Sequence, residues 1–105
     1  MITPRPFFST FLLLCLTSSA AMAEISFGGG DGSSKDSAIL IIGATDESSG
    51  VASEYDWIKT NRAEAVILQQ KLLQQSSKVY DVMIIKTGTQ KEEIYFDITD
   101  FYGDM

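Results

Sequence analysis

Two aspartates in the C-terminal half have the spacing of a candidate chemical site. Asp81 lies in the alternating run Tyr80–Lys86, and Asp97 lies in the run Glu92–Ile98. If these runs pair as antiparallel strands, the two carboxylates face each other. Such a pair either raises the pKa of one member or holds a cation. The pattern supplies no third ligand, so we expect two solvated carboxylates, with no metal and no catalytic role.

The residue types that are missing exclude several classes of chemistry. The only cysteine is Cys15, and the chain contains no histidine. Beyond residue 23, disulfides, thiolate or imidazole metal sites and cysteine or serine–histidine nucleophile pairs are therefore excluded. A general base would have to be an aspartate or a glutamate, and nothing in the pattern puts one in a pocket. We expect that the protein is not an enzyme and takes no cofactor.

The glycine-rich segment 24–36 invites a search for a phosphate or calcium loop. A phosphate-binding loop needs a glycine where this chain has Ser33, and the closing bidentate glutamate of a calcium loop is missing. The segment has no face to bury. Its composition predicts a flexible Gly/Ser-rich linker over 24–36.

The N-terminus has the three parts of a secretory signal. Arg5 precedes the apolar run Phe7–Leu16, and small residues follow, ending in Ala21-Met22-Ala23. The run is shorter than the roughly 20 apolar residues that span a bilayer. Acylation at Cys15 is disfavoured because the residue before it is large. Residues 1–23 are therefore predicted to be a signal peptide, and the protein to be periplasmic or secreted.

The charge of the chain limits its partners. The formal net charge is −6, with 14 acidic and 8 basic residues. Nucleic-acid binding rests on neutralising phosphates with lysine and arginine, so an acidic chain disfavours it. Anionic membrane surfaces are disfavoured for the same reason. We expect neither nucleic acid nor a membrane as a partner after signal cleavage.

The middle of the chain predicts one strand and one helix. Ser37–Gly43 is a short apolar run rich in β-branched residues, which favours a buried strand. From Gly50 the apolar period changes to that of a helix of about three turns, with Ser49 as its N-cap and Glu54 facing solvent. The predicted apolar stripe consists of Val51, Tyr55 and Ile58.

The two C-terminal runs predict a β-hairpin around the loop Thr87–Lys91. With Lys86 facing Glu92, one face of the hairpin is wholly apolar, as a core-facing sheet requires. The core-facing pairs are Ile84–Ile94, Val82–Phe96 and Tyr80–Ile98. The opposite face would carry Asp81–Asp97, Met83–Tyr95 and Ile85–Glu93.

The segment 63–75 is ambiguous. Its alanine, leucine, glutamine, glutamate and lysine residues favour a helix by intrinsic propensity. Its polar and apolar residues also alternate, which places Val66, Leu68 and Leu72 on one face of an extended chain and is compatible with a strand.

Three stretches of the chain resemble small exported bacterial proteins of unknown function. They are the opening Gly30–Ser34, the segment Gly50–Ile58, which includes Glu54-Tyr55-Asp56-Trp57-Ile58, and the ending from Tyr80-Asp81-Val82 to Gly103. In those proteins the segment corresponding to Val66–Leu73 looks like a strand, so the resemblance favours a strand here. The resemblance supplies no function.

The resulting expectation is a single α+β domain over 37–105. One helix packs on a small antiparallel sheet, in the order strand, helix, strand, strand, strand. Cystatins share a helix cradled by an antiparallel sheet, but this comparison is topological only. Their inhibitory Gln-x-Val-x-Gly hairpin is not present in this chain, which argues against a cystatin-like protease inhibitor.

We expect a non-catalytic binding or interaction module whose partner is a protein or peptide. The candidate surface is the sheet face away from the helix, carrying Met83, Tyr95 and Ile85, which is too apolar to be purely solvated. Trp57 is a further candidate anchor, although it is more simply explained as the edge of the core. The alternative is an accessory structural subunit, in which Phe101 and Tyr102 of the tail cover that same face.

We predict that the mature protein begins at Glu24. The Ala-x-Ala ending after a short apolar run is the physical reason, because small side chains fit the subsites of a signal peptidase. Intact-mass measurement of exported material should give the mass of 24–105. A retained Met1 or an acylated Cys15 would contradict the prediction.

Overall fold

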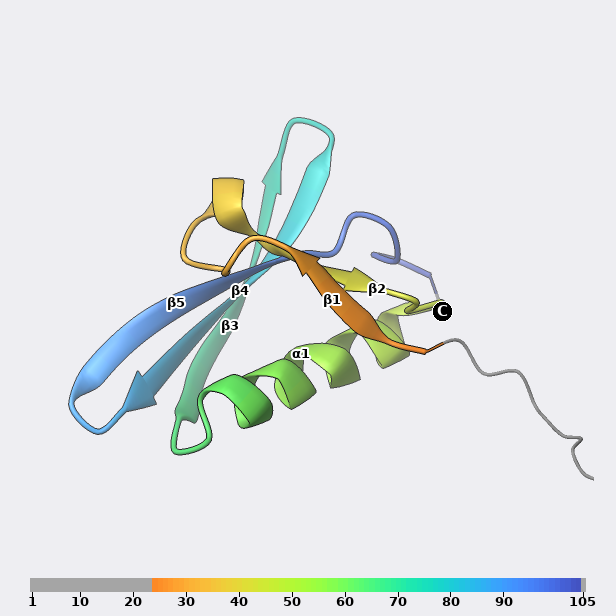
Figure 1. Ribbon diagram of the computed structural model, residues 1–105. Coiled ribbons are helices and arrows are strands. Elements are labelled where there is room, and N and C mark those ends of the chain that lie inside the picture. The colour runs from red at the N-terminus through yellow and green to blue at the C-terminus, as the bar shows by residue number, and fades with distance from the viewer. Residues whose placement is uncertain (1–23, 105) are drawn as a thin grey trace, which may run out of the picture.

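The computed structural model describes residues 24–104 and shows one helix packed on a five-stranded mixed sheet (Figure 1). The sheet order is β1-β2-β5-β4-β3, with a single parallel pair, β2 and β5. The elements are β1 (Ser26–Gly29), the 3₁₀ helix η2 (Lys35–Ser37), β2 (Ile39–Ile42), α1 (Glu47–Asn61), β3 (Val66–Gln75), β4 (Lys78–Thr87) and β5 (Gln90–Asp97). The predicted α+β class is confirmed, and so is its element order, from β2 through α1 to β5. The sheet is mixed and not wholly antiparallel as expected, because β2 and β5 run parallel.

The segment 24–36, expected to be a flexible linker, instead contains strand β1. This strand pairs antiparallel with β2, and the loop after it is held by hydrogen bonds from Gly30 N–H to the Ala38 carbonyl and from Tyr95 N–H to the Gly32 carbonyl. A Cβ on Gly30 would collide with the backbone of Ser37. The glycines therefore permit a close approach of two backbone segments, rather than providing flexibility.

The helix begins earlier than predicted, and its N-cap is Asp46. The Asp46 Oδ1 atom accepts a hydrogen bond of 2.8 Å from the Ser49 N–H, and the Ser49 hydroxyl lies near the Asp46 backbone N–H. This is a capping box in which Ser49 takes the N3 position. The prediction of Ser49 as N-cap was therefore wrong.

The buried face of α1 also differs from the predicted apolar stripe. Gly50, Ser53, Glu54 and Ile58 are buried, whereas Tyr55 is 42% exposed. Gly50 is required here because a Cβ would collide with the ring of Phe101, which packs against the helix at that point. The small residues let the sheet and tail approach closely, so this face carries few apolar side chains and was not recognised from its pattern.

The turn between β4 and β5 is shorter than predicted and shifts the hairpin register by one residue. Thr87 pairs with Gln90 around the two-residue turn Gly88-Thr89, and Gly88 has a φ of 63°. A glycine with positive φ at the first central position suits a tight hairpin turn. Lys86 consequently lies opposite Lys91 instead of Glu92. The predicted register was wrong.

The shifted register exchanges the two faces of β4. Met83 and Ile85 face α1 with no exposed surface, while Val82 and Ile84 lie on the opposite face. The orientation of β5 is as predicted, with Ile94 toward the core. The main core consists of Ile39, Ile41, Ile58, Met83, Ile85, Ile94, Phe96, Ile98 and Phe101.

The expectation that Val66–Leu73 is a strand is confirmed, and the strand pairs with β4. The connecting turn has two residues, Ser76 and Ser77, with Ser76 at a φ of 57°, so Gln75 pairs with Lys78. A β-bulge interrupts the pairing at Leu68. Pairing with β4 outweighs the helical propensity of the segment.

Alanine substitutions at neighbouring positions of β4 test the observed register. We expect Met83→Ala to cost about 2–5 kcal/mol, because it leaves a cavity in the core. Ile84→Ala should cost less than half as much, since Ile84 is half-buried on the other face. Chemical denaturation of the two variants and the wild type measures the difference. If the hairpin had the predicted five-residue loop, Ile84 would face the core and Ile84→Ala would cost more stability than Met83→Ala.

Candidate functional site

Asp81 and Asp97 lie on opposite faces of the sheet and form no common site. Asp81 is opposite Phe96 on the face that packs against α1, whereas Asp97 is opposite Tyr80 on the other face. The expected facing pair was wrong because it depended on the displaced register. Among residues 24–104, no group of three or more potential ligands is placed to hold a metal ion.

Asp81 instead lies beside a second buried acid, Glu54 of α1. Glu54 has no exposed surface, and neither carboxyl oxygen has a hydrogen-bond partner within the described chain. Burial, together with the neighbouring Asp81 carboxyl group, raises the pKa of Glu54 to about 10. Glu54 is therefore protonated at neutral pH. The expectation that it faces solvent was wrong.

Gln70 of β3, which is exposed, extends this polar cluster from the buried acids to the surface. Its Nε2 donates a 3.0 Å hydrogen bond to Asp81 Oδ2, and its Oε1 accepts a 3.2 Å hydrogen bond from the Tyr55 hydroxyl. The cluster thus connects α1, β3 and β4 through side chains. A glutamine on the core side of an edge strand has a structural reason here, since it satisfies the buried Asp81.

The buried acid pair has almost no exposed surface: Glu54 is 0% exposed and Asp81 is 5% exposed. Three hollows in the surface of residues 24–104 are lined by other side chains, and neither Glu54 nor Asp81 borders any of them. A perturbed carboxyl pKa is characteristic of catalytic acids only where a ligand can reach the group. The pair therefore lies in the contact between α1 and β4, away from these hollows.

The sheet face opposite α1, called the outer face below, collects most of the basic residues. Alternation along paired strands places one lysine of β3, two of β4 and one of β5 there, and η2 adds another over the same face. These residues are Lys71, Lys78, Lys86, Lys91 and Lys35. Only two strand acids, Glu93 and Asp97, share this face, although acids predominate in the whole chain.

Three of these lysines have no ion pair in the described part of the protein: Lys71, Lys86 and Lys91. Lys86 and Lys91 are direct cross-strand neighbours, an arrangement that destabilises a sheet by a few tenths of a kcal/mol. The outer face also exposes apolar side chains: Val66, directly opposite Lys86, is 61% exposed, and Ile42 and Leu40 of β2, on the side of the sheet near Asp97, are 50% and 39% exposed. It therefore combines unneutralised positive charge with exposed apolar surface.

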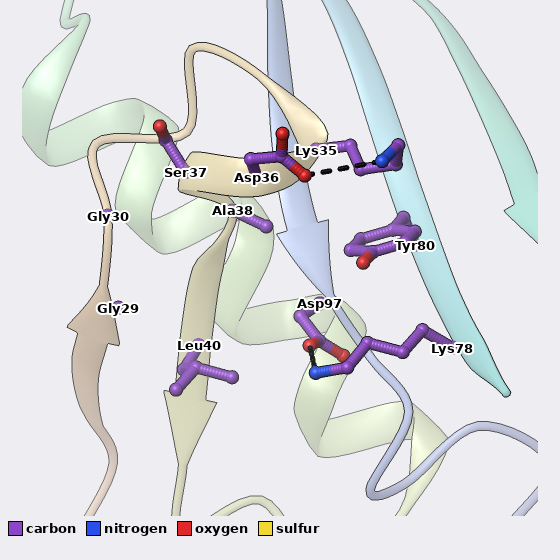
Figure 2. Close-up of a pocket in the computed structure, with 10 residues that line it drawn as sticks. All are labelled: Gly29, Gly30, Lys35, Asp36, Ser37, Ala38, Leu40, Lys78, Tyr80 and Asp97. Atoms are coloured by element: carbon purple, nitrogen blue, oxygen red, sulfur yellow. Dashed lines mark hydrogen bonds and ion pairs between the residues drawn. The ribbon is translucent and has the colours of Figure 1, made fainter. Parts of the chain in front are cut away.

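A hollow of about 590 Å³ lies at one end of the outer face, between the η2 loop and the start of β4 (Figure 2). Lys78 Nζ lies 3.2 Å from Asp97 Oδ2, and Lys35 Nζ lies 3.2 Å from Asp36 Oδ1. Burial acts to raise the pKa of Asp97, but hydrogen bonds from Thr99 and Lys78 outweigh it and hold the pKa below its ordinary value. The ion pairs make this hollow electrically balanced.

The predicted partner-binding residues do not form one surface. Met83 is fully buried under α1, and only Tyr95 lies on the outer face, where its hydroxyl donates to Glu93. Trp57 is half-buried, edge-on to Phe96 with ring centroids 5.8 Å apart, and the Arg62 guanidinium covers its ring at 5.5 Å. Trp57 thus closes the edge of the core.

The C-terminal tail does not cover the outer face. Phe101 packs into the core against α1, and the Asp104 carbonyl accepts a 2.7 Å hydrogen bond from the Glu47 N–H at the start of the helix. The tail therefore closes the helix side of the sheet. The lysines of the outer face could have been found from sequence by their alternation, whereas Glu54 carries no such signal.

No family model, curated protein or solved structure matches this chain. Between residues 24 and 104, no helix has the length and apolar character needed to cross a membrane. The predicted signal peptide lies outside the described residues.

The buried acid predicts a distinctive pH dependence of stability. Folded Glu54 keeps its proton to about pH 10, whereas the unfolded chain releases it near the ordinary value of 4.5. Stability should therefore fall as pH rises from 5 to 7, by up to about 2–3 kcal/mol at about 1.36 kcal/mol per pH unit. The lowered pKa values of Asp46, Glu92 and Asp97 affect stability only below this window.

Glu54→Gln should remove the decrease in unfolding free energy between pH 5 and 8. It should also make the protein more stable than wild type at pH 8, because a neutral amide replaces the acid. Urea denaturation across pH 5–8 measures it. Glu64→Gln, a change at an exposed position, is the matched control and should keep the wild-type slope. An unchanged slope in Glu54→Gln would mean that the acid is not buried in solution.

Proposed function

We propose that the protein is a non-catalytic interaction module whose outer face binds an acidic segment of a protein or peptide. The observation that carries the proposal is a group of three lysines, Lys71, Lys86 and Lys91, that have no ion pair among residues 24–104 and lie on a sheet face with exposed apolar side chains. Charged groups at an interface direct association and orientation, and apolar groups contribute the buried area.

The arrangement along β4 gives this surface a direction. The residues of β4 that point outward are, in order, Lys78, Tyr80, Val82, Ile84 and Lys86. A lysine therefore stands at each end of this row, and the two Cα atoms are separated by about 26 Å at 3.3 Å per residue. Between them Tyr80 and Val82 are buried, at 7% and 2% exposure, and only Ile84 is partly exposed. The positive charge that is not neutralised lies at the Lys86 end of this row, because Lys78 is paired with Asp97.

A protein partner is favoured over a polyanion by the charge of the rest of the molecule. The chain has a net charge of −6, which opposes close approach of nucleic acid or another densely charged polymer. A short acidic segment meets only the local positive charge. The position of the tail against α1 supports an open binding face, rather than a face covered by the protein itself.

Charge reversal on the outer face tests the proposal. The probe is a capped nine-residue peptide in which glutamate alternates with tyrosine, and a lysine–tyrosine peptide of the same length is its control. We expect the triple variant Lys71→Glu/Lys86→Glu/Lys91→Glu to bind the acidic probe at least tenfold more weakly than wild type. Raising the salt concentration should weaken wild-type binding, because exposed charges are screened.

Lys59→Glu is the matched control variant, since Lys59 is an exposed lysine of α1. Its affinity for the acidic probe should stay within twofold of wild type. NMR titration gives both the affinities and the residues whose amide shifts change. Equal binding of the acidic and basic probes, or no loss in the triple variant, would refute the proposal.

A further inference from the structure

Strand β3 is a long free edge of the sheet. It runs for ten residues, from Val66 to Gln75, and within residues 24–104 it pairs with β4 on one side only. The outward backbone N–H and C=O groups of such a strand are available to an added strand. The other edge, β1, has four residues of which two are glycines, so it is a poorer template.

The side chains of β3 make this edge unusually apolar for an exposed strand. Val66 is 61% exposed, Leu72 is 48% exposed and Leu68 is 46% exposed. In β-strand addition, backbone hydrogen bonds supply affinity and the alternating side chains next to the added strand supply specificity. After the bulge at Leu68, the pairing of Gln69–Gln75 with β4 is regular, which leaves a straight template of seven residues.

The charge of this edge indicates which strand fits it. No acidic residue occurs between Glu64 and Asp81, although the chain has 14 acids, and the only charged residue of β3 is Lys71. A lysine and a bulge on an edge strand oppose pairing with a second copy of the same edge. An acidic strand, in contrast, gains a favourable cross-strand pair with Lys71.

We propose that the acidic partner binds by adding an extended strand to β3 along Gln69–Gln75. This inference rests on the proposed function and specifies how the same partner docks. Alternate side chains of the added strand then lie on the outer face, where its acids meet Lys71. The side chains between them lie beside Leu72 on the α1 side. The partner completes a six-stranded sheet, and its remaining surface reaches the lysines of β4 and β5.

Backbone methylation of the probe tests strand addition directly. Two forms of the capped glutamate–tyrosine peptide are made, each N-methylated at alternate residues. One form lacks the backbone N–H donors along one edge of the extended peptide, and the second form lacks those along the opposite edge. We expect one form to bind at least tenfold more weakly and the other to bind within threefold of the unmethylated peptide. Hydrogen exchange of alternate amides within Gln69–Gln75 should slow at least tenfold in the complex.

The two proposals fail in distinguishable ways. If both methylated forms bind like the parent peptide while the lysine variant still loses affinity, the peptide lies flat on the outer face and strand addition is wrong. If the lysine variant binds normally, the proposed function itself is wrong. Sedimentation of the free protein is the remaining check, and a stable dimer with protected β3 amides would assign the edge to a second copy and overturn the inference.

Discussion

The register of the central strand β4 is the constraint on which the rest of the structure depends. Two-residue turns join it to both neighbours, at Ser76-Ser77 and at Gly88-Thr89. Side chains alternate along a strand, so a shift of one residue in either turn would exchange its two faces. The present register brings Met83 and Ile85 under the helix and forms the core with β5. It also brings Asp81 under the helix, where a buried carboxyl group needs hydrogen-bond partners.

The polar cluster around Asp81 is the consequence of that register. A carboxylate only accepts hydrogen bonds, whereas a protonated carboxyl group can also donate one. Glu54 in its acid form and the Gln70 amide are therefore compatible neighbours of Asp81, while an ionised Glu54 would repel it. Burying this cluster costs stability relative to an apolar contact of the same shape.

The same alternation separates charge between the two sides of the sheet. Lysines gather on the outer face, and no helix, tail or loop of the described chain pairs with Lys71, Lys86 or Lys91. The free edge of β3 borders this face and is itself devoid of acids. Unpaired lysines and an unpaired backbone edge therefore occur side by side, and both are complementary to the same type of ligand, an extended acidic segment. The closeness of these lysines to the free edge of β3 is the basis of both the proposed function and the proposed mode of docking.

The sequence alone determined the fold class, the strand at Ile39–Ile42, the presence of one helix and the hairpin formed by β4 and β5. It also predicted correctly that Ile94 and Phe96 belong to the core, because the period-two pattern of β5 is unambiguous. Local signals are sufficient for these features. The strand at Val66–Gln75 required pairing with β4 to outweigh helical propensity, and residue preferences alone would have predicted a second helix.

Only the tertiary structure decided which face of β4 is buried, which face of α1 is buried, and that Asp81 and Asp97 are separated by the sheet. Both faces of β4 are apolar, so the pattern did not distinguish a two-residue from a five-residue turn. The buried face of α1 carries Gly50, Ser53 and Glu54, residue types that are normally exposed. Their burial depends on Phe101 and Asp81, which are distant in sequence. The physical reason is the same in each case: alternation and periodicity define faces, but contacts between distant segments select the face that is buried.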